Sequence, residues 1–162
     1  AQGAHLTLVD YNKEVLEKAT AEVRQQYPGI PLLTLVADVS KEDQVKKYVD
    51  ETVKEFGRID GLYNNAGIEG RQASMTNYDL AIFQKVIDIN LMGVYYGMRY
   101  VLPVMQKQQY GRIVNVASVG GIRGVFIGTP SAAATARGPP RRPHPGSAPP
   151  RRPAPQPVRA WR

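Results

Sequence analysis

The sequence predicts an α/β protein built around a parallel sheet, and two observations support this prediction. Short apolar segments alternate with segments whose apolar residues recur at helical spacing, giving strand, helix, strand, helix, strand, helix, strand over residues 5–118. The connections between them are short, as in sheets whose parallel strands are joined through helices. We therefore expect helices on both faces of the sheet and ligand-binding residues at the carboxyl ends of its strands.

Four apolar segments are expected to form the strands: residues 5–9, 32–36, 59–63 and 112–118. The third strand runs into Asn-Asn-Ala-Gly at 64–67, which brings two amides and two small residues to the sheet edge. Small residues there let a ligand or another backbone approach closely. Taken alone, this tetrapeptide is equally compatible with an ordinary turn.

Three helices are expected, over about residues 12–27, 41–56 and 79–106. The second has the most regular apolar face, and Ser40 is its expected N-cap. The residues expected to face the core are Val15, Leu16, Ala19, Val23 and Tyr27 in the first helix; Val45, Tyr48, Val49, Thr52, Val53 and Phe56 in the second; and Phe83, Val86, Ile87, Asn90, Val94, Met98, Val101, Leu102 and Met105 in the third.

Composition fits one globular domain with a basic C-terminal segment. The 162 residues suffice for a single core, and the absence of cysteine fits a reducing compartment, so we expect a cytoplasmic protein without disulfides or a metal site. No apolar run approaches membrane-spanning length, so no membrane association is expected. The net charge of +7 comes from seven arginines in residues 137–162, because the other 14 basic residues are balanced by 14 acidic ones.

Polar residues follow the first two expected strands. Asp10 can accept hydrogen bonds from a ribose 2′-OH and would repel a 2′-phosphate, which favours NAD over NADP. Asp38 can accept from an exocyclic amine of a base, with Val39 adding apolar contact. The structural alternative for both aspartates is capping of the helix that follows.

Two further polar residues stand in apolar surroundings. Asn90 lies within the third helix, where asparagine has a poor propensity and needs a hydrogen-bond partner, either a neighbouring backbone group or a water. Ser118 ends the fourth strand, and its hydroxyl could face a ligand or simply form a turn.

These residues together resemble the classical short-chain dehydrogenase/reductase family in order and spacing. The resemblance rests on Asp10, Asp38-Val39, Asn64-Asn65-Ala66-Gly67, Asn90 and the run Gly-Arg-Ile-Val-Asn-Val-Ala-Ser at 111–118, and it covers about residues 1–128. It looks most like the NAD-dependent reductases of cyclic ketones. It implies a Rossmann-type doubly wound sheet and hydride transfer between NAD and a secondary alcohol or ketone.

The resemblance also implies roles for individual residues. Asp10 would bind the adenosine ribose, and Asp38 and Val39 the adenine. Asn65, Ala66 and Gly67 would lie along the cofactor. Ser118 would hydrogen-bond the substrate oxygen and Asn90 would position a water, while the 79–106 helix would pack against its copy in a homo-oligomer.

The sequence departs from the family pattern at two places. The glycine-rich phosphate loop would lie about 20 residues before Asp10, so we expect the first strand and this loop to be missing and the sequence to be part of a longer protein. The family's Tyr and Lys, which follow the Ser, would fall near Ser131 and Thr135. The last Tyr is Tyr110 and the last Lys is Lys107, so we predict that this chain is inactive.

Residues 129–162 differ in composition from the rest, since ten of the thirteen prolines lie from Pro130 onward. We expect this segment to be disordered. Three interpretations compete: a basic arm for an acidic partner, a proline-rich ligand, and the product of a shifted reading frame or wrong splice. Nucleic-acid binding is not expected, because the segment has no aromatic residue other than Trp161 and no RNA-binding fold precedes it. We favour the last interpretation, because the composition changes where family-like sequence should continue. The alternative function is a non-catalytic α/β module whose basic tail binds an acidic partner.

Overall fold

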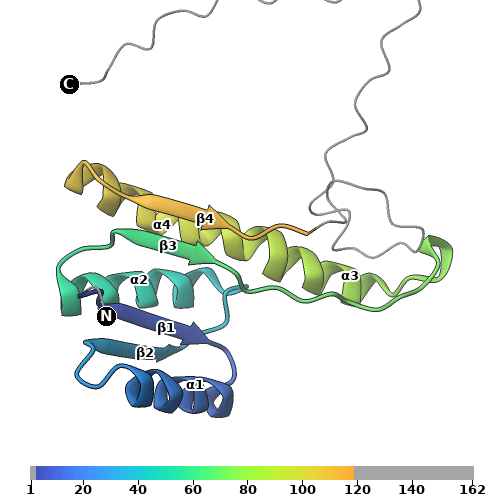
Figure 1. The fold of residues 1–162 in the computed structure, drawn as a ribbon. Helices are drawn as coiled ribbons and strands as arrows, with labels where there is room; N and C mark the ends of the chain where they lie inside the picture. The colour runs from blue at the N-terminus through green and yellow to red at the C-terminus, as the bar shows by residue number, and fades with distance from the viewer. Residues whose placement is uncertain (1–2, 119–162) are drawn as a thin grey trace, which may run out of the picture.

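The computed structural model describes residues 3–118, and strands and helices alternate along this range as the sequence predicts (Figure 1). The strands are β1 (Leu6–Asp10), β2 (Leu32–Val36), β3 (Gly61–Asn64) and β4 (Arg112–Asn115). The helices are α1 (Lys13–Gln26), α2 (Glu42–Phe56), α3 (Leu80–Ile87) and α4 (Gly93–Gln108). The 129–162 segment of the sequence analysis lies outside the described residues.

The strands form two parallel pairs rather than one continuous sheet. β1 pairs with β2 in the register Leu6↔Leu32, and β3 pairs with β4 in the register Gly61↔Arg112. Within the described residues β1 and β3 do not pair with each other, and a groove lies between them. The α/β class and the incompleteness of the sheet are therefore both as expected.

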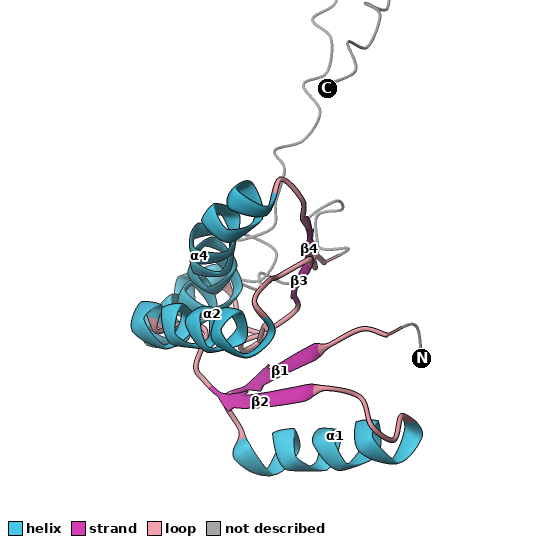
Figure 2. Cartoon of the chain, turned by 90° about the vertical axis from the view of Figure 1, so that its left-hand side faces the viewer, coloured by secondary structure: helices cyan, strands magenta, loops and turns pink. Residues whose placement is uncertain are grey.

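Helices cover both faces of the strands. Figure 2 shows α2 and α4 on one side and α1 on the opposite side of β1 and β2. α1 contacts β1 and β2, while α2 packs against α4 and α4 against β3. The two-sided arrangement expected from the alternating pattern is confirmed.

The main core lies between α2, α4 and the strands β3 and β4. Val49, Ile59, Val101 and Met105 are buried there, and half-buried side chains surround them, namely Tyr48, Val53, Leu62, Tyr100, Val104 and Ile113. The expected apolar face of α2 is confirmed by this packing.

Three residues expected in the core are exposed instead. Val15 and Leu102 are 54% and 43% exposed, and Tyr27 is 44% exposed. α1 covers only a two-stranded sheet, so Val15 extends beyond the surface that the helix can bury. Leu102 follows the buried Val101 and therefore points about 100° away from the face of α4 that packs on α2.

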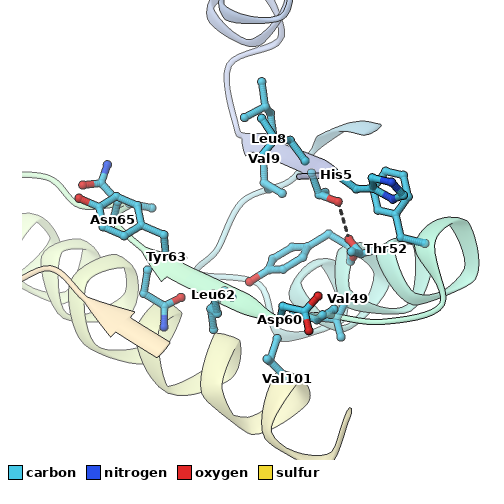
Figure 3. A pocket seen from close by; sticks show the side chains of 18 of the residues that line it. His5, Leu8, Val9, Val49, Thr52, Asp60, Leu62, Tyr63, Asn65 and Val101 are labelled. Atoms are coloured by element: carbon cyan, nitrogen blue, oxygen red, sulfur yellow. Dashed lines mark hydrogen bonds between the residues drawn. The ribbon is translucent and has the colours of Figure 1, made fainter. Parts of the chain in front are cut away.

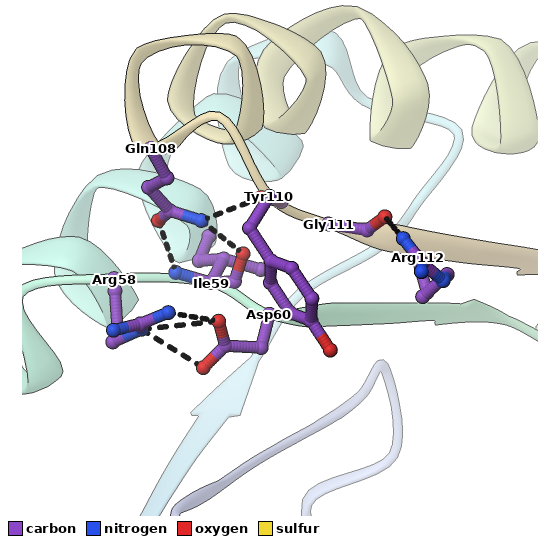
Figure 4. Close-up of polar contacts among 7 residues, drawn as sticks. All are labelled: Arg58, Ile59, Asp60, Gln108, Tyr110, Gly111 and Arg112. Atoms are coloured by element: carbon purple, nitrogen blue, oxygen red, sulfur yellow. Dashed lines mark hydrogen bonds and ion pairs between the residues drawn. The ribbon is translucent and has the colours of Figure 1, made fainter. Parts of the chain in front are cut away.

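The third strand begins two residues later than the sequence predicts, because a glutamine side chain binds the backbone of Ile59. Nε2 of Gln108 donates to the Ile59 carbonyl and to the Tyr110 carbonyl at 2.8 and 3.0 Å, and Oε1 of Gln108 accepts from the Ile59 N–H at 2.8 Å (Figure 4). Arg58 and Asp60 form an exposed ion pair beside this contact. The backbone of Ile59 is thus bound to the end of α4, and β3 begins two residues later at Gly61.

Ser40 is not the N-cap of α2. The N-cap is Lys41, whose side chain makes no capping bond, and the Ser40 hydroxyl instead donates to Oδ1 of Asp38 at 2.7 Å. The other end is as expected, since Gly57 ends α2 in the left-handed conformation, with φ of 76°, that glycine adopts at little cost.

The expected 79–106 helix is interrupted by a π-helical turn at Asp88–Met92 between α3 and α4. This turn contains Asn90, and π-turns of this kind are frequent at functional sites. None of the helices within residues 3–118 has both the length and the apolar character needed to cross a membrane.

Candidate functional site

The parallel strands bring the predicted site residues to one edge of the molecule. All four arrows point the same way in Figure 1, so the segments after β1, β2, β3 and β4 emerge at one edge. Asp10 ends β1, Asp38 lies two residues beyond β2, Asn65 follows β3, and Ser118 lies three residues beyond β4. This is the edge at which open α/β sheets bind ligands.

Asp10 shapes the turn after β1 without capping α1. Its Oδ1 accepts from the N–H of Asn12 at 2.8 Å, and Asn12 is the N-cap, with its side chain accepting from the N–H of Val15 at 3.1 Å. The capping interpretation of Asp10 is therefore wrong. The turn holds a half-buried carboxylate at the end of the strand.

Asp38 organises the β2–α2 connection. Its Oδ1 accepts from the N–H and the hydroxyl of Ser40 at 2.9 and 2.7 Å, and its own N–H donates to Oε1 of Gln44 at 2.8 Å. Three hydrogen bonds thus join Asp38 to Ser40 and Gln44. The result is a connection whose backbone is held in one conformation.

Val39 packs directly on the first residue of α4. A Cβ built on Gly93 would lie 2.9 Å from Cγ2 of Val39, which leaves no room for a side chain. A second close approach follows one turn later, because a Cβ on Gly97 would lie 2.6 Å from Oδ1 of Asn64. Neither glycine was predicted as a site residue, although their spacing of four residues on one helix face was a usable signal.

Asn64 is structural rather than exposed to a ligand. Its Nδ2 donates to Oδ1 of Asn115 at 2.9 Å and to the carbonyl of Val94 at 3.5 Å, so it ties the ends of β3 and β4 to each other and to α4. Asn65, Ala66 and Gly67, which follow, are all exposed. Of the four residues in the Asn-Asn-Ala-Gly run, the structure leaves these three accessible to a ligand.

Asn90 clamps the loop after β3. Its Oδ1 accepts from the N–H of Ile68 and its Nδ2 donates to the carbonyl of Ile68, both at 2.9 Å. Gly67 lies against the same amide, since a Cβ there would be 3.4 Å from Oδ1 of Asn90. Of the two partners considered for Asn90, a backbone group or a water, the structure shows the backbone group.

Ser118 is exposed beyond β4. Among residues 3–118 no three histidine, aspartate or glutamate side chains are grouped as metal ligands would be. The site therefore consists of carboxylates, amides, a hydroxyl and small residues along one edge.

Comparison with known proteins shows which family has this arrangement of strands and site residues. A family model described as short chain dehydrogenase matches residues 1–136. The chain belongs to the short-chain dehydrogenase family. It is 52% identical to levodione reductase of Leifsonia aquatica over 125 residues, covering 77% of this chain and 47% of the relative. The chain thus spans about half the length of this relative.

Three solved structures share this fold. The crystal structure of levodione reductase superposes with a TM-score of 0.80 at 50% identity, covering 83% of this chain and 52% of the other. NAD⁺-bound xylitol dehydrogenase gives a TM-score of 0.71 at 41% identity, covering 80% of this chain and 47% of the other. ElxO with NADP bound gives a TM-score of 0.70 at 29% identity, covering 81% of this chain and 52% of the other. Proteins similar to this chain therefore bind either NAD or NADP.

Proposed function

We propose that residues 1–128 form part of the cofactor-binding domain of an NAD-dependent dehydrogenase that acts on a secondary alcohol or ketone. One observation carries the proposal: the parallel strands deliver Asp10, Asp38 and the exposed residues 65–67 to the same edge. NAD, when bound, supplies or accepts the hydride. Levodione reductase and xylitol dehydrogenase, both similar to this chain, support this substrate class.

The proposed adenosine site uses the first two strand ends. Asp10 offers a half-buried carboxylate whose Oδ1 is engaged by Asn12, and the proposal assigns its other oxygen to a ribose hydroxyl. Asp38 and Val39 would contact the adenine, with Val39 fixed in place by Gly93. Carboxylates accept hydrogen bonds from hydroxyls and amines, whereas a 2′-phosphate beside Asp10 would be repelled. The donor and acceptor chemistry of this edge therefore fits NAD better than NADP.

The proposed reaction site lies at the other two strand ends. Asn65, Ala66 and Gly67 would lie along the cofactor, and Ser118 would donate to the substrate oxygen. Asn90 would act mainly as a positioning residue, because both atoms of its amide hold Ile68. A water held by Asn90 would use the second lone pair or the second N–H that each amide atom retains.

We also propose that this chain does not catalyse hydride transfer by itself. No Tyr follows Tyr110 and no Lys follows Lys107 in the sequence, so a general acid of that type is missing after Ser118. Loss of a general acid typically lowers the rate about 10²- to 10⁴-fold. NADH oxidation with a cyclic ketone, followed by the loss of nicotinamide absorbance, should stay at the no-enzyme background. Turnover that scales with protein concentration would contradict this.

For the whole protein we propose that the α3–α4 segment contributes to a subunit contact. Leu91, Tyr95 and Leu102 are exposed large apolar side chains on it, at 46%, 46% and 43%. Tyr96 and Met98, on the same helix, are half-buried. Sedimentation should show self-association that Tyr95→Glu weakens, and an unchanged monomer in both proteins would contradict the assignment.

Calorimetric titration with NAD⁺ and NADP⁺ tests the proposed cofactor. NAD⁺ should bind more tightly than NADP⁺, and Asp10→Ala should weaken NAD⁺ binding about 10- to 100-fold, because a hydrogen bond to a charged group is worth about 1.5–3 kcal/mol. The same variant should also have a smaller difference in affinity between NAD⁺ and NADP⁺. Glu14→Gln, an exposed acid on α1, is the matched control and should change neither affinity. Equal affinities for the two cofactors in the unaltered protein would contradict the assignment of Asp10.

A further inference from the structure

Gln44 lies in the first turn of α2 and binds the backbone of the β2–α2 connection. Its Oε1 accepts from the N–H of Asp38 at 2.8 Å. Because Lys41 is the N-cap of α2, Gln44 occupies the third helical position, from which a glutamine ordinarily accepts from the N–H of the N-cap itself. Here the side chain instead reaches a residue three positions before the N-cap. The contact therefore holds a proposed site residue rather than the end of the helix.

Both backbone groups of Asp38 are held by residues outside the strands. The N–H of Ala37 donates to the carbonyl of Asp10, the last residue of β1, at 3.0 Å. In a parallel ladder the bonds to one neighbour come from alternate residues, so the next N–H, that of Asp38, points away from β1. Gln44 supplies the partner of this N–H, and the Asp38 carbonyl accepts from the N–H of Lys41 at 3.0 Å.

These contacts leave one carboxylate oxygen of Asp38 for a ligand. Oδ1 accepts both bonds from Ser40, at 2.9 and 2.7 Å. Within residues 3–118, the hydrogen bonds of Asp38 use its N–H, its carbonyl and Oδ1, and none uses Oδ2. Gln44 and Lys41 fix the backbone and Ser40 fixes Oδ1, so together they set the direction in which Oδ2 points.

Gln44 extends from a helix that is firmly packed. Val45, the next residue, is 0% exposed. Further along α2, the hydroxyls of Thr52 and Thr7 are hydrogen-bonded at 3.1 Å, which ties the helix to β1 (Figure 3). A site residue that is positioned from such an element keeps its geometry better than one positioned from a loop.

We propose that Gln44 is a positioning residue that directs Oδ2 of Asp38 towards the exocyclic amine of adenine and so makes the site selective for this base. The inference rests on the proposed function, because it takes the adenine position at Asp38 and Val39 from there. A carboxylate oxygen accepts from the 6-amino group of adenine, whereas the 6-oxo group of hypoxanthine is only an acceptor. The neutral amide of Gln44 binds the N–H without placing a second negative charge beside the Asp38 carboxylate.

Calorimetric titration of the full chain with NAD⁺ and with nicotinamide hypoxanthine dinucleotide tests the proposal. The unaltered protein should bind NAD⁺ about 10- to 100-fold more tightly, because only adenine donates to the charged oxygen of Asp38. Gln44→Ala should lower this ratio of affinities at least about threefold by weakening NAD⁺ binding, with little change for the hypoxanthine analogue. A side chain that only stabilised the connection would change both affinities alike.

Three variants separate positioning from a general effect on the fold. Gln44→Glu keeps an acceptor oxygen at the same reach and should retain most of the ratio, whereas Gln44→Asn is one methylene shorter and should behave as Gln44→Ala. Lys47→Gln, on the exposed surface of the next turn of α2, is the matched control and should leave the ratio unchanged. An unchanged ratio in Gln44→Ala would overturn the proposal. Binding of neither dinucleotide by the unaltered protein would instead contradict the proposed function.

Hydrogen exchange without any ligand tests the positioning step by itself. Gln44→Ala should speed amide exchange at Asp38 and also at Ser40, whose N–H donates to Oδ1 of Asp38. The amide of Val15, which is bound by Asn12, should exchange as in the unaltered protein. Faster exchange at Asp38 with no change at Ser40 would show that Gln44 does not position the carboxylate and would overturn the proposal, whether or not a dinucleotide binds.

Discussion

Replacement of Asn90 by alanine should destabilise the protein through the loop after β3. The Asn90 amide makes two 2.9 Å hydrogen bonds to the N–H and C=O of Ile68, a half-buried residue. Each such bond contributes about 0.5–1.5 kcal/mol net, and a buried group left without a partner costs about 1–3 kcal/mol. Because Ile68 is only half-buried, water partly replaces the lost bonds. We expect Asn90→Ala to lower the free energy of unfolding by about 2 kcal/mol.

Urea unfolding gives the loss of free energy, and hydrogen exchange at the Ile68 amide reports the local effect. The variant should lower the urea midpoint without changing the slope, and Ile68 should exchange faster in native conditions. Gln84→Ala is the matched control, since Gln84 donates to Asp88 at 2.8 Å on the exposed surface nearby, and it should change stability by less than about 0.5 kcal/mol. Unchanged stability and unchanged exchange at Ile68 in Asn90→Ala would show that the Asn90 amide does not stabilise the loop at Ile68.

Three further changes test the packing, the polar contacts and the pH dependence. Gly97→Ala should destabilise by about 1–3 kcal/mol in urea unfolding, despite the better helix propensity of alanine, because its Cβ would lie 2.6 Å from Oδ1 of Asn64. Gln108→Ala should cost about 1–3 kcal/mol by freeing the backbone of the buried Ile59. Burial raises the pKa of Tyr48 above its usual value of 10.0. The free energy of unfolding should therefore fall as pH rises above 10, and it should fall less in the Tyr48→Phe variant.

Each of these changes has an internal comparison. Gly61→Ala places a Cβ with nothing within 4 Å, so a loss equal to that of Gly97→Ala would show that crowding is not the cause. Gln106→Ala removes an exposed side chain two residues from Gln108 and should be nearly neutral. An alkaline decline that is the same in Tyr48→Phe and in the unaltered protein would assign the titration to other groups.

The sequence predicted the order of elements because each helix and strand has its own apolar period. The regular face of α2 led directly to Val45 and Val49, which are 0% and 2% exposed. Parallel alternation also predicted that Asp10, Asp38 and Asn65 would follow strands at one edge, since this depends only on chain direction. Such features are local, or follow from local features through topology.

Features that depend on contacts between distant segments were not predictable in this way. Ile59 has the apolar character of a strand residue, but Gln108 binds its backbone from 49 positions away. Ser40 has the chemistry of an N-cap, yet Asp38 competes for its hydroxyl. The π-turn contains Asn90, whose amide contacts Ile68 across 22 positions. In each case a side-chain hydrogen bond accompanies the departure from the local preference.

The separation of β1 from β3 links the fold to the proposed function. Asp10 and Asn65 lie at the carboxyl end of the two strands that border the groove, and both line it. The proposed cofactor site therefore lies at one end of this groove.

We propose that the carboxyl edge of the strands binds the adenosine part of NAD. Titration of the isotope-labelled protein with NAD⁺, followed by backbone amide NMR shifts, tests this placement. We expect saturable shifts that concentrate at Asp10, Asp38, Val39 and residues 65–67, and smaller shifts at the same positions with NADP⁺. Shifts confined to the amino ends of the strands, or no saturable shift at any concentration of NAD⁺, would contradict it.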